Sequence, residues 1–189
     1  MSEDERSSEP AGVEAGGLGS SWQRAMERSE QVGRILREAG WTLALAESCT
    51  GGLVAHFVTE IPGSSKYFIL GAVTYANRAK ERLLAVSGED LARFGAVSRK
   101  VAEAMARGVR DLAAADCVVG ITGIAGPGGG TKRKPVGTVY LAALGPWGLL
   151  ERREVFSGSR SEIKVQAAAV ALDMLVEACQ KGGGRARKA

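Results

Sequence analysis

The sequence predicts an α/β fold in which helices cover both faces of a mixed sheet of about five strands. Short, fully apolar runs alternate along the chain with longer segments of helical periodicity, which is the pattern of an α/β protein. The last two apolar runs are separated only by Gly145-Pro146-Trp147-Gly148, which is too short for a parallel crossover and predicts an antiparallel hairpin. A chain of 189 residues suits one domain of this kind better than two.

The first half of the chain contains two strand patterns, each followed by a helix pattern. The opening helix ends at Gly40, and the next helix ends at Pro62-Gly63. Asn77 directly follows the second strand and is the predicted N-cap of the helix after it. The predicted order is helix 21–38, strand 42–46, helix 51–59, strand 68–75, helix 77–84 and a short helix 89–94.

The second half of the chain begins with a long amphipathic helix, 98–115, for which Ser98 is the predicted N-cap. Its predicted apolar face consists of Val101, Ala104, Met105, Val109 and Leu112. Strands are expected at 117–121, 136–144 and 149–156, followed by a closing helix at 161–179. The last two of these strands form the hairpin.

The two ends of the chain differ in charge from its centre. Residues 1–19 are rich in Ser, Glu and Gly and are expected to form a disordered acidic tail. Residues 182–189 are expected to form a flexible basic tail, which leaves 20–181 as the folded domain. The formal net charge of +4 suits an anionic small-molecule substrate. It is too weak to indicate nucleic-acid binding, and the aromatic content of 5% points the same way.

Cysteine usage and hydropathy indicate a cytoplasmic protein. The three cysteines, Cys49, Cys117 and Cys179, are odd in number and lack metal-binding spacing. The N-terminus is acidic and resembles no signal peptide, and no apolar run approaches the ~20 residues that a membrane span requires. We therefore expect no membrane association, and a homo-oligomer remains possible.

The first concentration of chemically useful residues is Ala46-Glu47-Ser48-Cys49-Thr50-Gly51-Gly52, at the predicted passage from a buried strand to a helix. Ligands of open α/β sheets gather beyond the carboxyl ends of the strands, and a helix N-terminus offers free N–H groups. Ser48 is therefore either a nucleophile or simply a cap of the helix, a role that Thr50 could also fill. The segment lacks the Gly-x-Ser-x-Gly pattern of α/β-hydrolases.

A serine nucleophile needs a base, and the only histidine of the chain is poorly placed. His56 lies about 12 Å along the helix axis from Ser48, too far to accept its proton. Lys80 is the next candidate, because the nearby helix dipole and partial burial would lower its pKa. Tyr75 would relay the proton or hold the amine. The alternative is that Lys80 is a solvated lysine on a surface helix.

A glycine-rich loop, 122–130, directly follows the predicted strand 117–121. Its N–H groups could wrap an anion or a planar ring, and Lys132, Arg133 and Lys134 after it could attract a phosphate. The alternative is a flexible surface loop. Arg160, which precedes the last helix, either grips a phosphate or pairs with a surface carboxylate. With one histidine and no clustered carboxylates, no metal site is expected, and neither is a cofactor.

Taken together, these segments resemble the CinA-type C-terminal domain family, whose enzymatic members are nicotinamide-nucleotide amidohydrolases. The resemblance covers about residues 27–178, with motifs in the family's order. The motifs are Ala-Glu-Ser-Cys-Thr-Gly-Gly at 46–52, Gly-Ser-Ser at 63–65, Val-Thr-Tyr-x-Asn-x-x-Lys at 73–80, Gly-Ala-Val-Ser at 95–98, Thr-Gly-Ile-Ala-Gly-Pro-x-Gly-Gly at 122–130 and Lys-Pro-Val-Gly-Thr-Val at 134–139.

The resemblance implies a three-layer α/β/α sandwich and a serine amidohydrolase that converts nicotinamide mononucleotide (NMN) to nicotinic acid mononucleotide and ammonia. It implies Ser48 as the nucleophile and Lys80 as its assistant, with Tyr75 as a helper, and it requires neither metal nor cofactor. The larger family members carry a further N-terminal domain, whose activity we expect this chain to lack. The residues expected to contact the substrate are Cys49, Thr50, Gly51, Asn77, Thr122, Gly123, Gly126, Gly128 and Arg160.

The chain departs from the family pattern at two positions that bear on phosphate binding. Ser159 stands where the family often has Asp, and Lys164 stands where it often has Arg. The reaction class is therefore better supported than the substrate. Two other hypotheses remain open: a non-catalytic nucleotide-binding module of the same fold, and an enzyme in which Cys49 is the nucleophile.

Overall fold

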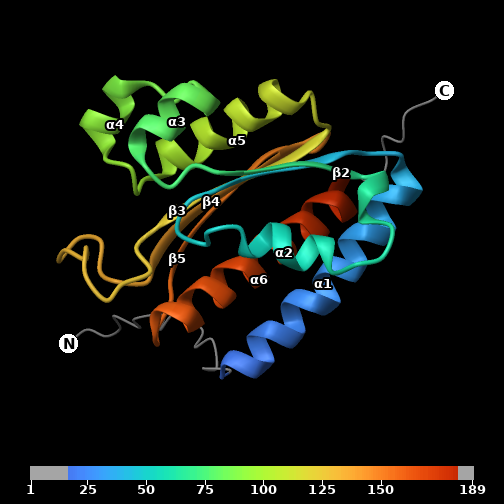
Figure 1. The fold of residues 1–189 in the computed structure, drawn as a ribbon, viewed down its shortest axis with the longest axis horizontal. Helices are drawn as coiled ribbons and strands as arrows, with labels where there is room; N and C mark the ends of the chain where they lie inside the picture. The colour runs from blue at the N-terminus through green and yellow to red at the C-terminus, as the bar shows by residue number, and fades with distance from the viewer. Residues whose placement is uncertain (1–16, 183–189) are drawn as a thin grey trace, which may run out of the picture.

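The computed structural model describes residues 17–182, which form a three-layer α/β/α sandwich (Figure 1). Helices and strands alternate along most of the chain, as the sequence predicts. The elements are α1 (Leu18–Ala39), β1 (Leu43–Glu47), α2 (Leu53–Thr59), a short 3-10 helix η1 (Ser64–Lys66), β2 (Phe68–Val73), α3 (Asn77–Leu84), α4 (Gly88–Phe94), α5 (Arg99–Ala113), β3 (Cys117–Gly123), β4 (Thr138–Gly145), β5 (Gly148–Val155) and α6 (Arg160–Gly182).

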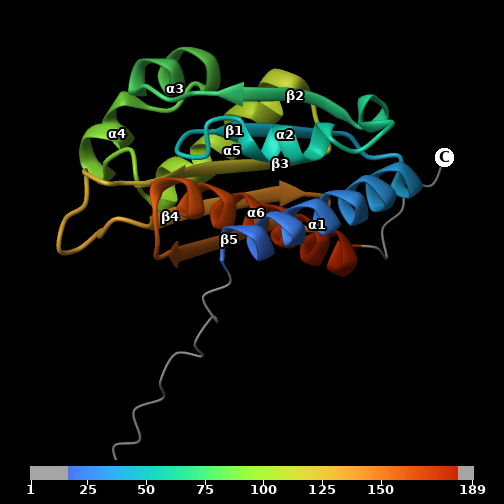
Figure 2. The ribbon, with the colours of Figure 1, turned by 60° about the horizontal axis from the view of Figure 1, so that its bottom comes forward.

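The sheet has the strand order β2-β1-β3-β4-β5, with β2 and β5 at its edges (Figure 2). β1 pairs in parallel with both β2 and β3, whereas β4 is antiparallel to β3 and β5. The chain therefore leaves β1 for β2 on one side and then crosses back to reach β3 on the other. The connections diverge beyond the carboxyl ends of β1 and β3, which is where open α/β sheets bind ligands.

The helices divide between the two faces of the sheet. α1, α2 and α6 cover one face, and α3, α4 and α5 cover the other (Figure 1). Alternate residues of β1 pack into the two cores: Leu43 and Leu45 face the α1–α2–α6 side, and Ala44 and Ala46 face α5. β1 is buried along its whole length, as expected for a strand covered on both faces.

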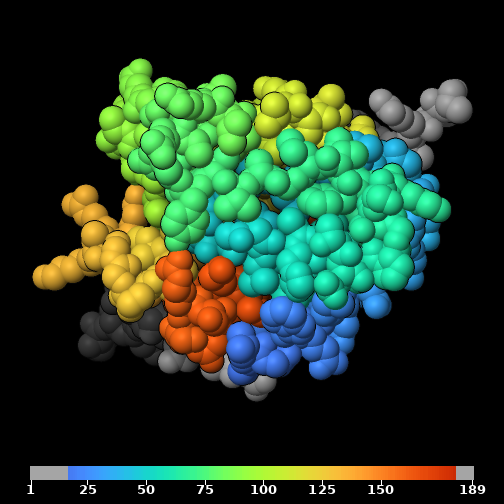
Figure 3. Space-filling view, in the orientation of Figure 1, coloured from blue at the N-terminus to red at the C-terminus, as the bar shows by residue number. Residues whose placement is uncertain are grey.

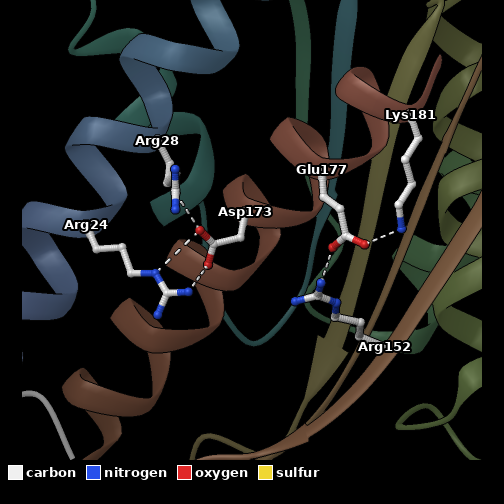
Figure 4. A network of polar contacts seen from close by, with 6 residues as sticks. All are labelled: Arg24, Arg28, Arg152, Asp173, Glu177 and Lys181. Carbon is white, nitrogen blue, oxygen red and sulfur yellow. Dashed lines mark hydrogen bonds and ion pairs between the residues drawn. The ribbon is translucent and has the colours of Figure 1, made fainter. Parts of the chain in front are cut away.

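Ion pairs connect α6 to its neighbours on the first face (Figure 4). Arg24 and Arg28 of α1 contact Asp173 of α6 at 2.6 and 2.7 Å. Arg152 of β5 contacts Glu177 of α6. Partly exposed pairs of this kind contribute roughly 0–1 kcal/mol each, so they help to orient the helices while the apolar core supplies most of the stability.

The structure corrects three predictions about the elements. The tails at 1–16 and 183–189 lie outside the described residues, but α1 begins at Leu18, inside the segment that the sequence assigned to the tail. Asn77 is the first residue of α3, and Ala76 occupies the N-cap position, so Asn77 is not the cap. Leu112 is 53% exposed rather than part of the buried face of α5. The predicted cap at Ser98 is confirmed, because its Oγ accepts the Val101 N–H.

The buried face of α5 uses small residues that the prediction passed over. Ala102 and Ala106 are buried beside Met105. A Cβ atom placed on Gly120 of β3 would lie 2.3 Å from the carbonyl oxygen of Ala102, so this helix runs close to the sheet. Because α5 lies so close to the sheet, its contact positions have room for alanine but not for leucine. Within residues 17–182, no helix combines the length and the apolar character that a membrane span needs.

Candidate active site

Three strand ends and the start of the last helix meet at one edge of the sheet. β1 ends before Ser48, β2 ends before Thr74, and β3 ends at Gly123. Because the three strands are parallel, their carboxyl ends lie along the same edge. In the space-filling view, the loop after β3 (yellow to orange) lies beside the orange start of α6, next to the blue-green segment that follows β1 (Figure 3).

Glu47, the last residue of β1, holds the turn that carries Ser48. Its carboxylate is buried and accepts the N–H groups of Gly52, Val54 and Ala55 at 2.9, 3.2 and 2.8 Å. These are the first free donors of α2, so the carboxylate caps this helix. No side chain at the N-cap position, Gly52, contributes such a bond. Capping is therefore done by Glu47, and the alternative role for Ser48 as a cap is wrong.

Lys80 is buried and points its amine at Ser48. Only 1% of this residue is exposed, so the alternative of a solvated surface lysine is wrong. Its Nζ lies 3.0 Å from Ser48 Oγ, 2.7 Å from the Thr74 carbonyl oxygen and 3.3 Å from the Tyr75 carbonyl oxygen. Burial lowers the pKa of the Lys80 amine, because an ammonium ion loses its hydration there. Nearby Cys49 acts weakly in the opposite direction.

The amine donates to three oxygens, which match the three N–H groups of its charged form. Loss of one proton would leave two N–H groups, enough for the carbonyl oxygens of Thr74 and Tyr75, and would free the lone pair for the Ser48 hydroxyl. In that neutral form Ser48 would donate to Lys80, and the amine could take the proton as Ser48 Oγ attacks an electrophile.

Cys49, next to the candidate nucleophile, is in an environment that suppresses its reactivity. Burial raises the pKa of its thiol to about 12. The thiolate is the nucleophilic form, so at neutral pH this side chain is almost entirely in the unreactive thiol form. A Cβ atom on Gly123 would lie 3.0 Å from Cys49 Sγ, so the sulfur also packs directly against β3.

Tyr75 and Arg160 meet across the opening of the site. The Tyr75 side chain is 59% exposed, and its hydroxyl lies 2.6 Å from Arg160 Nη2. Arg160 Nη1 donates to the Gly126 carbonyl oxygen at 2.7 Å. The backbone carbonyl of Tyr75, rather than its phenol, therefore contacts the Lys80 amine. Arg160 makes no ion pair with a surface carboxylate among the described residues, so that alternative is wrong and its charge faces the site.

The glycine-rich loop after β3 forms one wall of the site. Gly123 has no room for a side chain, since a Cβ there would lie 2.7 Å from Val139 Cγ2 and 2.8 Å from the Thr138 carbonyl oxygen. Gly126 has a φ of +77°, a conformation that favours glycine. Thr122 donates through Oγ1 to the Ala96 carbonyl oxygen at 2.8 Å, which links this wall to the segment before α5.

A cavity of about 270 Å³ joins these residues. It includes both members of the Ser48–Lys80 pair, and of the expected site residues only Thr50 and Gly51 lie outside it. Thr50 is fully buried, and Gly51 donates its N–H to the Ser48 carbonyl oxygen, so both shape the turn. The residues that line the cavity are Ser48, Cys49, Tyr75, Asn77, Lys80, Ala96, Val97, Thr122, Gly123, Ile124, Ala125, Gly126, Gly128, Gly129 and Arg160.

Sequence reasoning from individual residues missed part of this cavity. Ala96 and Val97 line it from the loop before α5, although they lie far from the other segments in the chain. The family motif at 95–98 was the one available signal for them. Lys134, expected to attract a phosphate, instead donates to the Phe94 and Val97 carbonyl oxygens and holds this loop in place.

The remaining candidates lie away from the cavity. Lys132 and Arg133 do not line it, and both are exposed. His56 packs against Trp22 and Phe57, outside the cavity lining. Among residues 17–182 no three His, Cys, Asp or Glu side chains group as metal ligands would.

Comparison with known proteins gives consistent matches over nearly the whole domain. The model of the CinA C-terminal domain family matches residues 25–179. A CinA-like protein of Geobacter sulfurreducens is 56% identical over 144 residues, which are 76% of this chain and 35% of that protein. The nicotinamide-nucleotide amidohydrolase PncC of Enterobacter agglomerans is 47% identical over 153 residues, covering 80% of this chain and 93% of that protein. The chain spans about a third of the length of the CinA-like relatives from Geobacter and Geotalea that it matches.

Solved structures of similar proteins superpose closely on this chain. The competence/damage inducible protein of Agrobacterium tumefaciens superposes with a TM-score of 0.80 at 41% identity, covering 82% of this chain and 95% of that one. A CinA superfamily protein of Klebsiella pneumoniae superposes with a TM-score of 0.79 at 35% identity, covering 82% and 98%.

Proposed function

The chain belongs to the CinA C-terminal domain family, and from this premise we propose that it is an amidohydrolase that converts NMN and water to nicotinic acid mononucleotide and ammonia. The observation that carries the proposal is the contact between Lys80 Nζ and Ser48 Oγ, 3.0 Å long and buried in the cavity wall. The activity for which the PncC relative is named supplies the substrate, and this chain matches that relative along almost its full length.

The proposed reaction has two halves. Neutral Lys80 accepts the Ser48 proton while Ser48 Oγ attacks the carboxamide carbon, which gives a tetrahedral intermediate. Lys80 then returns the proton to the amide nitrogen, the C–N bond breaks and ammonia leaves an ester on Ser48. Water, deprotonated by the same amine, attacks the ester and releases the carboxylate product and the free serine.

Arg160 is the proposed partner of the substrate phosphate. Its guanidinium lies in the cavity lining, and its two described hydrogen bonds, to Gly126 and Tyr75, fix it without neutralising its charge. Arginine binds phosphate through charge-assisted hydrogen bonds. Asn77 and the loop residues from Thr122 to Gly128 complete the proposed contacts, while Thr50 and Gly51 contribute only through the shape of the turn. The three cysteines, all free and buried, suit a reducing compartment, and we propose that the protein acts in the cytoplasm.

The test is an ammonia-release assay of the purified protein with NMN, nicotinamide riboside and nicotinamide. We expect turnover of NMN that Ser48→Ala abolishes and Lys80→Ala reduces by about 10²–10⁴-fold, the usual contribution of a general base. Cys49→Ala, one residue along the same turn, is the matched comparison: it should keep the turnover number, whereas loss of a side chain from the cavity lining can raise the KM for NMN. If Cys49→Ala is inactive while Ser48→Ala remains active, the nucleophile is Cys49 and not Ser48. NMN binding by calorimetry without ammonia release would instead favour the non-catalytic module.

A further inference from the structure

A second cavity, of about 540 Å³, lies at the outer strands of the sheet, on the face that α3, α4 and α5 cover. Tyr140 of β4 and Arg153 of β5 line it from directly opposite positions, and Glu151 lies two residues before Arg153. Glu151 in turn lies opposite Ala142, which packs into the core beneath α5, so all of these side chains share that face. The volume is within the range of about 300–1,000 Å³ that is typical of small-molecule sites.

The cavity exists because the helices stop short of β5 on this face. β4 is buried along almost its whole length, whereas β5 contains no fully buried residue. Leu149, Arg153 and Val155, which lie on the same face of β5 as Glu151, are exposed. α5 therefore forms a side wall of the cavity and does not cover it. The other lining residues belong to the first turns of α5 and its N-cap, to the end of α4 and to the loop before β4: Ser98, Arg99, Lys100, Glu103, Phe94 and Lys134.

Four cationic side chains line this cavity, against two carboxylates. Each of the two carboxylates already has an arginine partner, at 3.4 and 2.9 Å. Within residues 17–182, neither Lys100 nor Arg153 forms an ion pair. Arg153 Nη2 donates to the Arg133 carbonyl oxygen at 3.5 Å, a contact that leaves its charge uncompensated. The cavity therefore offers two cations for charge-assisted hydrogen bonds to a phosphate.

Two aromatic rings and an unsatisfied carboxylate oxygen line the same cavity. The Tyr140 ring centroid lies 5.9 Å from the guanidinium carbon of Arg153, and Phe94 is 39% exposed. Aromatic rings beside cations suit a planar base that carries a phosphate. Glu151 Oε1 is buried and has no hydrogen-bond partner among the described residues, so a ligand hydroxyl that reaches it satisfies an orphaned acceptor. Carboxylates bind ribose hydroxyls in this way in dinucleotide-binding folds.

We propose that this second cavity is a further binding site and that its ligand is a nucleotide. In the proposed arrangement the phosphates contact Lys100 and Arg153. The base packs against Phe94 and Tyr140, and the sugar hydroxyls face Glu151. A nucleotide is the class of small molecule that combines a phosphate, a planar ring and vicinal hydroxyls, and each of these has its counterpart among the lining residues.

The second cavity and the active-site cavity around Ser48 share one segment of the chain, residues 94–98, but no lining residue among those that the structure describes. Phe94 and Ser98 line the second cavity, whereas Ala96 and Val97 line the active-site cavity. Lys134 lines the second cavity and donates to the carbonyl oxygens of Phe94 and Val97 at 3.1 and 2.6 Å. Its removal would therefore disturb both cavities, whereas Lys100 and Arg153 can be changed without touching the active site.

Calorimetric titration with ADP tests the proposal. ADP carries no carboxamide, so the measurement does not depend on the amidohydrolase reaction. We expect ADP to bind the unmodified chain, with a Kd that rises about 10-fold or more in Lys100→Gln and in Arg153→Gln, because each loses a charge-assisted hydrogen bond. Arg110→Gln is the matched control: it removes the same charge about 15 Å along α5 from Lys100, and the Kd should not change. Absence of ADP binding, or an equal loss in Arg110→Gln, would overturn the proposal.

Two further measurements locate the bound ADP and identify the class of ligand. Arg160→Gln, in the active-site cavity, should leave the Kd for ADP unchanged, and a loss of binding there but not in Arg153→Gln would overturn the proposal. Inorganic phosphate, the second probe, should bind about 10-fold or more weakly than ADP. Phe94→Ala should weaken the binding of ADP but not of phosphate, since stacking of a base on an aromatic ring adds affinity. Phosphate that binds as tightly as ADP would exclude a role for the rings and overturn the assignment to nucleotides.

Discussion

Burial of the Lys80 amine makes the candidate base available and lowers the stability of the folded state. A lysine in water is charged at neutral pH, whereas here the charged form is disfavoured because the side chain is almost entirely buried. Two backbone carbonyls and one hydroxyl offset part of the loss of hydration. The amine at the site is therefore less basic than that of a solvated lysine, and its burial lowers the free energy of unfolding at neutral pH.

This coupling predicts how the stability of the protein depends on pH. The folded-state pKa of Lys80 lies below its unfolded value of 10.5, so between these two values the unfolded chain binds more protons. The contribution of Lys80 to the free energy of unfolding must therefore rise with pH between these two values. We expect the free energy of unfolding of the unmodified chain, measured in urea relative to Lys80→Met, to increase as the pH rises toward 10.5. A difference that stays constant or falls would contradict the lowered pKa.

The helix that follows Ser48 depends on a carboxylate that precedes it in the chain. α2 is short, and its free N–H groups are bound by Glu47 from the end of β1. This single side chain fixes both the start of the helix and the turn between strand and helix. The position of Ser48 therefore depends on an element boundary as well as on the residue itself.

Removing this carboxylate should damage stability and the site together. We expect Glu47→Ala to lower the free energy of unfolding by about 2–4 kcal/mol, because it leaves one buried and two part-buried N–H groups without partners. Activity should fall as well, since the turn loses its support. Glu60→Ala is the control, because Glu60 is exposed near the other end of the same helix, and its effect should stay within about 0.5 kcal/mol. Urea unfolding of both variants measures the difference, and equal effects would argue against the capping role.

The contact between α3 and α5 positions the helix that carries Lys80. A Cβ atom on Gly108 of α5 would lie 2.0 Å from the Leu84 carbonyl oxygen at the end of α3. Helix propensity alone predicts that alanine here stabilises by about 1 kcal/mol. The clash is with backbone, which cannot rotate away, so we expect Gly108→Ala to destabilise by about 1–3 kcal/mol or more. Thermal unfolding shows whether Gly108→Ala stabilises or destabilises the protein. Gly128→Ala is the control, because a Cβ atom added there meets no atom within 4 Å.

Across the molecule, the parts that sequence could predict are those set by local pattern. The apolar runs at 117–121 and 136–144 predicted their strands, and the Gly145–Gly148 turn predicted the hairpin, because strand burial and turn length are local properties. The face of α5 was mispredicted at Leu112, since close packing against Gly120 favours Ala102 and Ala106 over larger residues. Glu47 was missed because its partners are defined only once β1 and α2 are placed. Ala96 and Val97 were missed for the same reason, because their place in the cavity is defined only by the folded chain.

The overall charge of the chain bears on how it would attract an anionic substrate. The formal net charge is +4, but single charges act over only about 10 Å at 0.1 M salt. Lys181 stands at the far end of α6 from Arg160, roughly 30 Å away along the helix. The proposed attraction for a phosphate is therefore local to the cavity, and charges elsewhere on the surface contribute little.

This argument gives a prediction in which one basic residue matters and another does not. Arg160→Gln should raise the KM for NMN by about 10-fold, which is about 1.4 kcal/mol. It should also weaken the increase in KM with salt, because the screened charge is gone. Lys181→Gln removes the same formal charge and should leave both quantities unchanged. Initial rates at about 0.01 M and about 1 M salt test this, since the screening length falls from about 30 Å to about 3 Å. If both variants lose salt dependence equally, the attraction comes from the whole surface and Arg160 has no special role.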